Sequence, residues 1–142
     1  MRRAVLEIGA FARVVAASRV YETLPVGGPP QPNFLNAAVL VSTTLDARGL
    51  LDALLAVEAK LGRVRDVRNG PRIVDLDLLW IDGVVLDATD LVVPHPRLLD
   101  RAFALVPLLE VARGAIDPRT RAAIEPLQDA SGVTLTALTL LD

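Results

Sequence analysis

Two aspartates, Asp75 and Asp77, stand two positions apart in the apolar stretch over residues 73–81. Alternate side chains of a strand point to the same face, so the sequence predicts both carboxylates on one face and Leu76 and Leu78 in a core. Neighbouring carboxylates offer the hard oxygen ligands that Mg²⁺ prefers. The stretch therefore predicts a strand that presents a magnesium site.

An arginine-rich loop precedes the two aspartates. Five basic side chains face one acidic side chain, Asp66, within thirteen residues: Lys60, Arg63, Arg65, Arg68 and Arg72. Guanidinium groups bind phosphate through paired hydrogen bonds, and a metal ion bridges carboxylate and phosphate oxygens. An Asp-Leu-Asp pair alone also fits a half-exposed strand edge, but the arginines weaken that alternative. Together the loop and the strand predict phosphoryl-type chemistry on a magnesium-bound polyphosphate.

His95 is the only histidine, and a proline stands on each side of it. A single histidine cannot form a histidine-based metal cluster, so His95 is a candidate phosphate donor or proton carrier. The alternative is a loop histidine that bonds to nearby backbone.

Phe34, Phe103 and Asn36 are candidates for binding a flat heterocycle. Phe34 follows a loop rich in proline and glycine, and Phe103 follows the segment that holds His95. Two phenylalanines can stack on a ring, and an asparagine offers a donor and an acceptor to its edge. Taken singly, the phenylalanines also fit a core, and Asn36 also fits a structural bond to the adjacent loop.

The elements that must position these residues are interleaved strands and helices. Asp46 is expected to cap a helix over residues 47–61, which Gly62 ends. The other expected elements are strands over residues 3–8, 12–22, 34–44 and 73–81, a hairpin turn at Asp82 and Gly83 leading into residues 84–86, a helix start after Pro96, an apolar segment over residues 104–111 and an alternating stretch from Val133. This order predicts an α+β fold with a mainly antiparallel sheet.

Length and composition limit the class of protein and the kinds of site that the chain can form. The 142 residues are 52% hydrophobic, carry a net charge of −2 and include no cysteine, so we expect a single globular domain over residues 1–142 without disulfides or thiolate metal sites. The slightly acidic balance weighs against a nucleic-acid binder. No apolar run reaches the roughly 20 residues of a membrane span, and the first residues do not fit a signal peptide. A cytoplasmic enzyme or binding module is expected.

Five segments, in order, resemble the 6-hydroxymethyl-7,8-dihydropterin pyrophosphokinase family of folate biosynthesis. They are Tyr-Glu-Thr-Leu-Pro-Val-Gly from Tyr21, Phe-Leu-Asn-Ala-Ala from Phe34, Gly-Arg-Val-Arg from Gly62, Arg-Asn-Gly-Pro-Arg-Ile-Val-Asp-Leu-Asp-Leu-Leu from Arg68, and Val-Pro-His-Pro-Arg-Leu-Leu-Asp-Arg-Ala-Phe from Val93. The most specific are the Gly-Pro-Arg-x-x-Asp-Leu-Asp segment and the later Pro-His. The resemblance implies a ferredoxin-like fold and transfer of pyrophosphate from ATP to the pterin hydroxymethyl group, which releases AMP.

The resemblance also implies roles for single residues. Asp75 and Asp77 match ligands of two Mg²⁺ ions on the ATP phosphates, and Asp77 is the candidate for assisting proton loss from the pterin hydroxyl. The matching catalytic arginines are Arg63 and Arg72; the ATP-side residues are Glu58, Arg65, Arg68, His95 and Arg101; and the pterin-side residues are the pair Phe34 and Phe103 with Asn36, Thr23 and Val26. Small-molecule substrates, a monomer and no nucleic-acid or membrane partner are expected, with association with other folate-pathway enzymes left open.

The sequence departs from the family pattern at several positions. Asn69 replaces an aromatic residue expected to close over the site, Pro96 stands where a tyrosine can occur, and Asp90 and Val92 replace an arginine and a threonine on the ATP side of some members. The family also has a crossover helix, which needs about a dozen residues, after its first strand. Between Ala10 and Phe11, either a segment is missing from the sequence or the chain is a shortened member with one flank of its sheet uncovered. We expect a missing segment, because Ile8 and Val14 would otherwise lack a packing partner.

Two rival functions come from other classes. A catalytically silent ferredoxin-like domain that binds a ligand or acts as a scaffold would keep these residues without turnover, although retention of both aspartates, His95 and the arginines argues against it. A small RNA-binding domain would use the arginine loop on phosphates, but the sequence lacks aromatic residues at strand spacing for stacking on bases.

Overall fold

The structure is a computed structural model that describes residues 1–24, 33–62 and 74–141. Within these ranges the chain forms α1 (Arg2–Ile8), β1 (Arg13–Ala17), β2 (Arg19–Thr23), β3 (Phe34–Asn36), β4 (Val39–Ser42), α2 (Ala47–Gly62), β5 (Leu86–Asp87), β6 (Val92–Val93), the 3-10 turn η1 (Leu98–Asp100), α3 (Ala102–Val111) and β7 (Val133–Thr139). Every paired strand in these ranges is antiparallel. The α+β class is thereby confirmed, and the ferredoxin-like arrangement stays a prediction.

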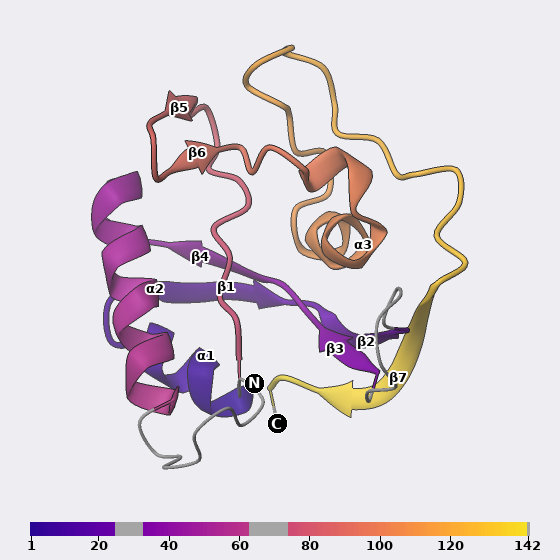
Figure 1. Cartoon of the computed structure of the whole chain (residues 1–142), viewed down its shortest axis with the longest axis horizontal. Helices are drawn as coiled ribbons and strands as arrows, with labels where there is room; N and C mark the ends of the chain where they lie inside the picture. Colours follow the sequence, from indigo (N-terminus) through magenta and orange to yellow (C-terminus); the bar gives the residue numbers. More distant parts are fainter. Residues whose placement is uncertain (25–32, 63–73, 142) are drawn as a thin grey trace.

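A long, bent ribbon of two arms forms the centre of the fold. One arm is β1 followed by β2, and the other is β3 followed by β4 (Figure 1). The arms join at Ser18, whose backbone N–H donates to the carbonyl of Ala38 and whose Oγ accepts from the N–H of Ala38, both at 2.8 Å. The strand predicted over residues 12–22 is therefore present but divided at Ser18, because a side-chain hydroxyl replaces a ladder bond there.

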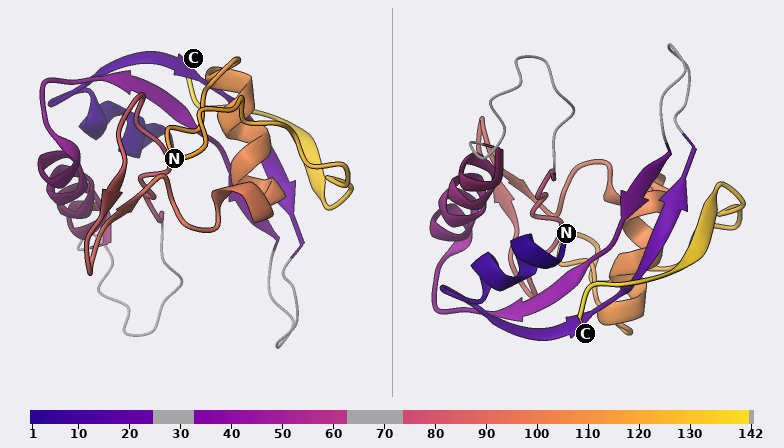
Figure 2. Two further views of the ribbon diagram at one scale, coloured as in Figure 1. Left: turned by 90° about the horizontal axis from the view of Figure 1, so that it is seen from above. Right: turned by 90° about the horizontal axis from the view of Figure 1, so that it is seen from below.

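The helices pack on the ribbon at separate places. Val39 and Val41 contact a cluster that contains Ile8 of α1 and Leu54 of α2, whereas Leu40 contacts the cluster of α3. Alternate residues of a strand point to opposite faces, so β4 is covered on both faces. α2 and α3 lie apart in both panels of Figure 2, with the yellow β7 beyond α3. The helices therefore cover different parts of the ribbon.

The strand predicted over residues 3–8 is wrong, because Arg2–Ile8 is helical. Ala4, Val5 and Ile8 are buried and Leu6 is 78% exposed. This pattern follows the helical period and would divide Val5 and Ile8 between opposite faces of a strand. Packing of this stripe against α2 and the ribbon therefore decides the conformation, over the β propensity of valine and isoleucine.

The strand predicted over residues 73–81 is also wrong within the described part, residues 74–81, which joins no sheet there. Its side chains nevertheless alternate, with Asp75 and Asp77 exposed and Leu76 and Leu78 half-buried in the cluster of α1 and α2. The same-face prediction for the two carboxylates therefore matches the burial pattern, while the backbone pairing that a strand requires does not form.

The predicted turn at Asp82 and Gly83 is confirmed, but not the hairpin. The N–H of Val84 donates to the carbonyl of Ile81 at 3.1 Å, and Gly83 has a φ of 71°, a left-handed value that suits glycine. The strand that follows, β5, pairs with β6 and not with the described residues 74–81.

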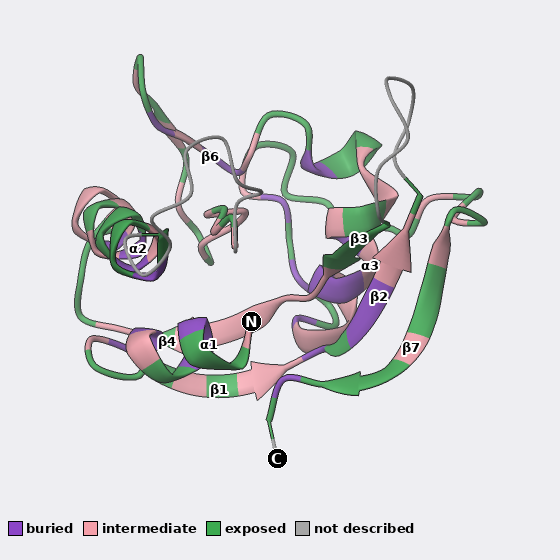
Figure 3. Cartoon of the chain, turned by 60° about the horizontal axis from the view of Figure 1, so that its bottom comes forward, coloured by how far each residue is buried: buried purple, intermediate pink, exposed green. Residues whose placement is uncertain are grey.

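α2 forms as predicted. Oδ1 of Asp46 accepts the backbone N–H of Gly49 at 2.8 Å, which is the expected cap, and the stripe of leucines is buried. The predicted helix beyond Pro96 is confirmed as η1 and α3. The alternating tail, whose arrangement the sequence leaves open, forms β7, which is largely exposed in Figure 3. None of the helices in the described ranges is long and apolar enough to cross a membrane.

The expected missing segment after Ala10 stays a prediction. A short turn joins α1 to β1, with the N–H of Phe11 donating to the carbonyl of Ile8 at 3.1 Å. Ile8 and Val14 pack in one cluster with Leu50 and Leu54 of α2. The packing argument for a missing segment is therefore wrong, because both residues have a partner.

Candidate active site

A cavity of about 140 Å³ brings together residues that are far apart in the sequence. Asn36 of β3, Asp75, Asp77 and Phe103 of α3 all line it. A carboxylate pair, an amide and an aromatic ring in one cavity can hold a polar group beside a flat ring. Four of the predicted site residues thus meet at one place.

The two aspartates also border a larger cleft of about 450 Å³. Its other walls are mostly apolar and come from β4, α2 and α3. Asp75 and Asp77 therefore line both hollows. The described residues contain no group of three or more His, Asp or Glu that could hold a metal. A divalent ion held by this pair would take its other ligands from bound oxygens.

Asn36 is oriented by the strand next to it. Its Nδ2 donates to Oγ1 of Thr23 at 3.0 Å across the β2–β3 pair. This bond uses one amide hydrogen and leaves the carbonyl oxygen and the second hydrogen for a ligand. Phe34 lies opposite Thr23 and is 51% exposed, and it does not line either hollow.

Arg101 lies against the second phenylalanine. Its guanidinium carbon is 5.6 Å from the centre of the Phe103 ring, within the range of a cation–π contact. Phe103 is 37% exposed, so its ring is available at the mouth of the small cavity.

His95 is held by its own loop. The backbone N–H of Arg97 donates to Nδ1 of His95 at 3.2 Å, so the neutral ring carries its proton on Nε2. Burial lowers the pKa of His95, the positive charges of Arg101 and Arg97 lower it further, and Asp77 opposes them. At neutral pH the ring is therefore an uncharged donor through Nε2.

The lowered pKa predicts how stability changes with pH. Between the folded pKa and the ordinary value of 6.5, the unfolded chain binds more protons at His95 than the folded chain does. We expect the free energy of unfolding to rise with pH in the window just below 6.5 and this rise to vanish in His95→Gln. Urea unfolding across that window measures both slopes, and because His95 is the only histidine, an unchanged slope in the variant would contradict the assignment.

Among the other predicted site residues, Thr23, Glu58, His95 and Arg101 line neither hollow. Arg63, Arg65, Arg68, Arg72 and Val26 lie outside the described residues, as does Asn69. Glu58 is half-buried on α2. Their roles stay predictions.

Among the carboxylates that carry tertiary contacts, Asp90 and Glu110 had not been assigned these contacts from the sequence. Asp90 holds the guanidinium of Arg48 from α2 through two bonds of 2.7 and 2.9 Å, so it ties α2 to the β5–β6 turn. Glu110 of α3 bonds to Tyr21 and Arg19 of β2. The signal for Glu110 was available, because it is the single charged residue in the ten-residue helix.

A sequence model of the 7,8-dihydro-6-hydroxymethylpterin-pyrophosphokinase (HPPK) family matches residues 1–113. The chain belongs to the HPPK family. The family match covers every predicted site residue, from Thr23 to Phe103, and continues through Glu110.

Curated HPPK relatives support the same assignment. The chain is 50% identical over 100 residues to the 2-amino-4-hydroxy-6-hydroxymethyldihydropteridine pyrophosphokinase of Methylorubrum extorquens, covering 70% of this chain and 63% of the relative. It is 43% identical over 110 residues to the enzyme of the same name from Bacillus subtilis, covering 78% and 66%. The chain thus spans just under two thirds of these relatives. It is also 41% identical over 107 residues to the folate synthesis bifunctional protein, mitochondrial, of Arabidopsis thaliana, covering 75% of this chain and 19% of the relative.

Proposed function

We propose that this chain transfers pyrophosphate from ATP to 6-hydroxymethyl-7,8-dihydropterin, giving AMP and the pterin diphosphate. The names of the HPPK relatives support this reaction class. The observation that carries the proposal is the small cavity, where the carboxylates of Asp75 and Asp77 meet Asn36 and Phe103. Phosphate-side and ring-side residues must meet in this way for a transfer between two bound substrates.

The carboxylates of Asp75 and Asp77 are proposed to hold two Mg²⁺ ions. Their exposure on one side and their hard oxygen donors fit an ion that also binds phosphate oxygens. When bound, such ions neutralise charge on the phosphates and on the departing AMP. His95 is proposed to donate from Nε2 to a phosphate oxygen, and Arg101, Glu58 and the arginines at 63, 65, 68 and 72 complete the proposed ATP side.

The pterin is proposed to stack on Phe103 and to present its polar edge to Asn36. The bond to Thr23 fixes the rotation of the Asn36 amide, so its remaining donor and acceptor face a ligand in a set direction. Phe34, exposed on β3, is proposed as the second stacking residue, and Val26 as an edge contact.

The reaction balances as an in-line displacement. The pterin hydroxyl oxygen forms a bond to the β-phosphorus of ATP, and the bond between that phosphorus and the oxygen bridging to the α-phosphate breaks. AMP leaves with the bridging oxygen, and the hydroxyl proton is lost, with Asp77 as the proposed acceptor. The arginines and His95 stabilise charge on the transferred group.

Product analysis tests this proposal. The chain is mixed with ATP, Mg²⁺ and the pterin, and the products are separated by chromatography. AMP and pterin diphosphate formed in equal amounts would support pyrophosphoryl transfer. ADP with a pterin monophosphate would show transfer of a single phosphoryl group, and either that result or the absence of AMP would overturn the proposal.

We also propose that the substrates are the only partners the site requires, with a monomeric protein acting in the cytoplasm. Relatives named as folic acid synthesis proteins and as a bifunctional protein include this family within longer chains. Because of these longer relatives, we also propose that the chain associates with other folate-pathway enzymes.

A further inference from the structure

The two sides of the small cavity come from different parts of the fold. Asn36 lies on β3, which pairs with β2, and Phe103 lies near the start of α3. A ligand that bonds to Asn36 and stacks on Phe103 therefore requires α3 to sit at one position on the β2–β3 pair. Contacts between α3 and the strands must fix that position.

Apolar packing alone sets the rotation of α3 poorly. The helix, Ala-Phe-Ala-Leu-Val-Pro-Leu-Leu-Glu-Val, has a single charged residue and is apolar around its circumference. Leu105 and Leu108 are buried in one cluster, but non-directional contacts of this kind tolerate rotation and sliding more than hydrogen bonds do. The direction of Phe103 then depends on polar contacts.

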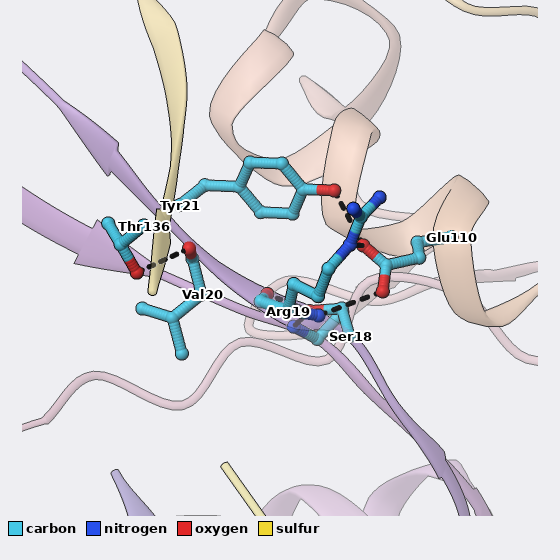
Figure 4. A network of polar contacts seen from close by, with 7 residues as sticks. Ser18, Arg19, Val20, Tyr21, Glu110 and Thr136 are labelled. Carbon is cyan, nitrogen blue, oxygen red and sulfur yellow. Dashed lines mark hydrogen bonds and ion pairs between the residues drawn. The ribbon is translucent and has the colours of Figure 1, made fainter. Parts of the chain in front are cut away.

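Glu110 provides directed contacts to β2 (Figure 4). Its Oε1 accepts the hydroxyl hydrogen of Tyr21 at 2.5 Å and the Nε hydrogen of Arg19 at 3.2 Å, and its Oε2 accepts the backbone N–H of Arg19 at 2.8 Å. Both carboxylate oxygens are therefore used, and the partners come from two positions on one strand. Three bonds in different directions restrict both the rotation and the sliding of α3.

Burial strengthens the bond between Tyr21 and Glu110. Tyr21 is 7% exposed and the Glu110 side chain is 19% exposed, so solvent screens this bond weakly, whereas the Arg19 side chain is 59% exposed and its charge is screened more. Burial opposes the charge of Glu110, but the bonds from Tyr21 and Arg19 outweigh it and lower the pKa of the carboxyl. Burial and the bond to Glu110 raise the pKa of Tyr21, so its hydroxyl remains a donor.

The contacts connect directly to the pterin side of the cavity. Tyr21 lies opposite Asn36 in the β2–β3 pair, and Glu110 lies seven residues after Phe103, which is about two helical turns and nearly the same face. We propose that Glu110, through Tyr21 and Arg19, is a positioning residue that holds Phe103 and Asn36 at the separation that pterin binding requires. This inference rests on the proposed function, because it assigns Glu110 to the pterin side of the same site.

Two variants test the inference. Glu110→Gln keeps the size of the side chain but replaces one acceptor with a donor, which then faces another donor. Tyr21→Phe removes a single bond and serves as the milder change. We expect Glu110→Gln to weaken equilibrium binding of 6-hydroxymethyl-7,8-dihydropterin by about tenfold, Tyr21→Phe to weaken it by about threefold, and both to leave ATP binding within about twofold.

A matched control separates positioning from general stability. Asp87→Asn removes a carboxylate charge from the ion pair with Arg119, whose bonds are 3.1 and 2.6 Å and whose residues line neither hollow. We expect pterin binding to be unchanged in this variant. Calorimetry well below the thermal midpoint of each variant measures both affinities, and a role confined to stability would lower the midpoint with no selective loss of pterin binding.

The outcomes distinguish the inference from the proposed function. Pterin binding by the wild-type chain, lost selectively in Glu110→Gln, supports both. Pterin binding by the wild type with equal affinity in Glu110→Gln and Tyr21→Phe overturns the positioning role and leaves the function standing. Absence of pterin binding by the folded wild-type chain overturns both.

Discussion

Asp75→Ala is expected to reduce the rate of AMP formation by at least about a thousandfold. The substitution removes one of the two carboxylates that line both hollows, and with it a ligand for the ions that neutralise the phosphates, a contribution of several kcal/mol to the transition state. Chromatography of AMP and pterin diphosphate under saturating ATP and Mg²⁺ measures the rate. Removal of the divalent ion with a chelator is expected to stop the wild-type reaction in the same assay.

An exposed carboxylate elsewhere is the control for this prediction. Asp52 lies on the exposed side of α2 and lines neither hollow, so Asp52→Ala is expected to keep the wild-type rate within about twofold. A rate within tenfold of wild type in Asp75→Ala would remove the aspartates from the reaction, provided that the protein remains folded by circular dichroism.

Phe103→Ala is expected to weaken pterin binding by roughly 5-fold to 150-fold. Stacking of a flat heterocycle on an aromatic ring is worth about 1–3 kcal/mol by alanine substitution, and the ring of Phe103 lies at the small cavity with Asn36. Removing the ring also removes the surface over which Arg101 lies. Titration of the pterin, followed by its fluorescence, gives the dissociation constant directly.

Phe103→Leu separates the contribution of the aromatic ring face to pterin binding from the contribution of apolar area. Leucine keeps most of the buried apolar area but has no aromatic face, so we expect it to recover less than half of the lost binding free energy. Full recovery by leucine would show that Phe103 contributes area alone. Exposed Leu55 of α2 offers a second control, because Leu55→Ala is expected to leave pterin binding unchanged.

The local sequence pattern predicted an element correctly where that element forms its backbone hydrogen bonds within itself. The leucine stripe, the Asp46 cap and the Gly62 end predicted α2 correctly, because a helix of sixteen residues makes its hydrogen bonds internally and shows several full periods. The prediction for the residues of α1 was wrong because that helix shows too few helical periods. Its seven residues span only two turns, too few for the helical period to outweigh the β propensity of valine and isoleucine.

Strand pairing was the second failure. Residues 73–81 alternate as a strand does, yet a strand forms only where another strand offers backbone partners, and in the described chain that partner is absent. The alternation still placed Asp75 and Asp77 on the exposed side, because side-chain direction follows extended backbone whether or not the backbone is paired.

The sequence by itself determined which chemical groups the candidate site can offer: two carboxylates at strand spacing, basic residues before them, one histidine between prolines and two phenylalanines beside polar residues. These are properties of residue type and spacing, which short-range geometry preserves. Only the tertiary structure decided that Asn36, Asp75, Asp77 and Phe103 share a cavity and that Glu110 ties α3 to β2. The reason is physical: the position of α3 on the ribbon depends on contacts between residues far apart along the chain, which no local pattern records.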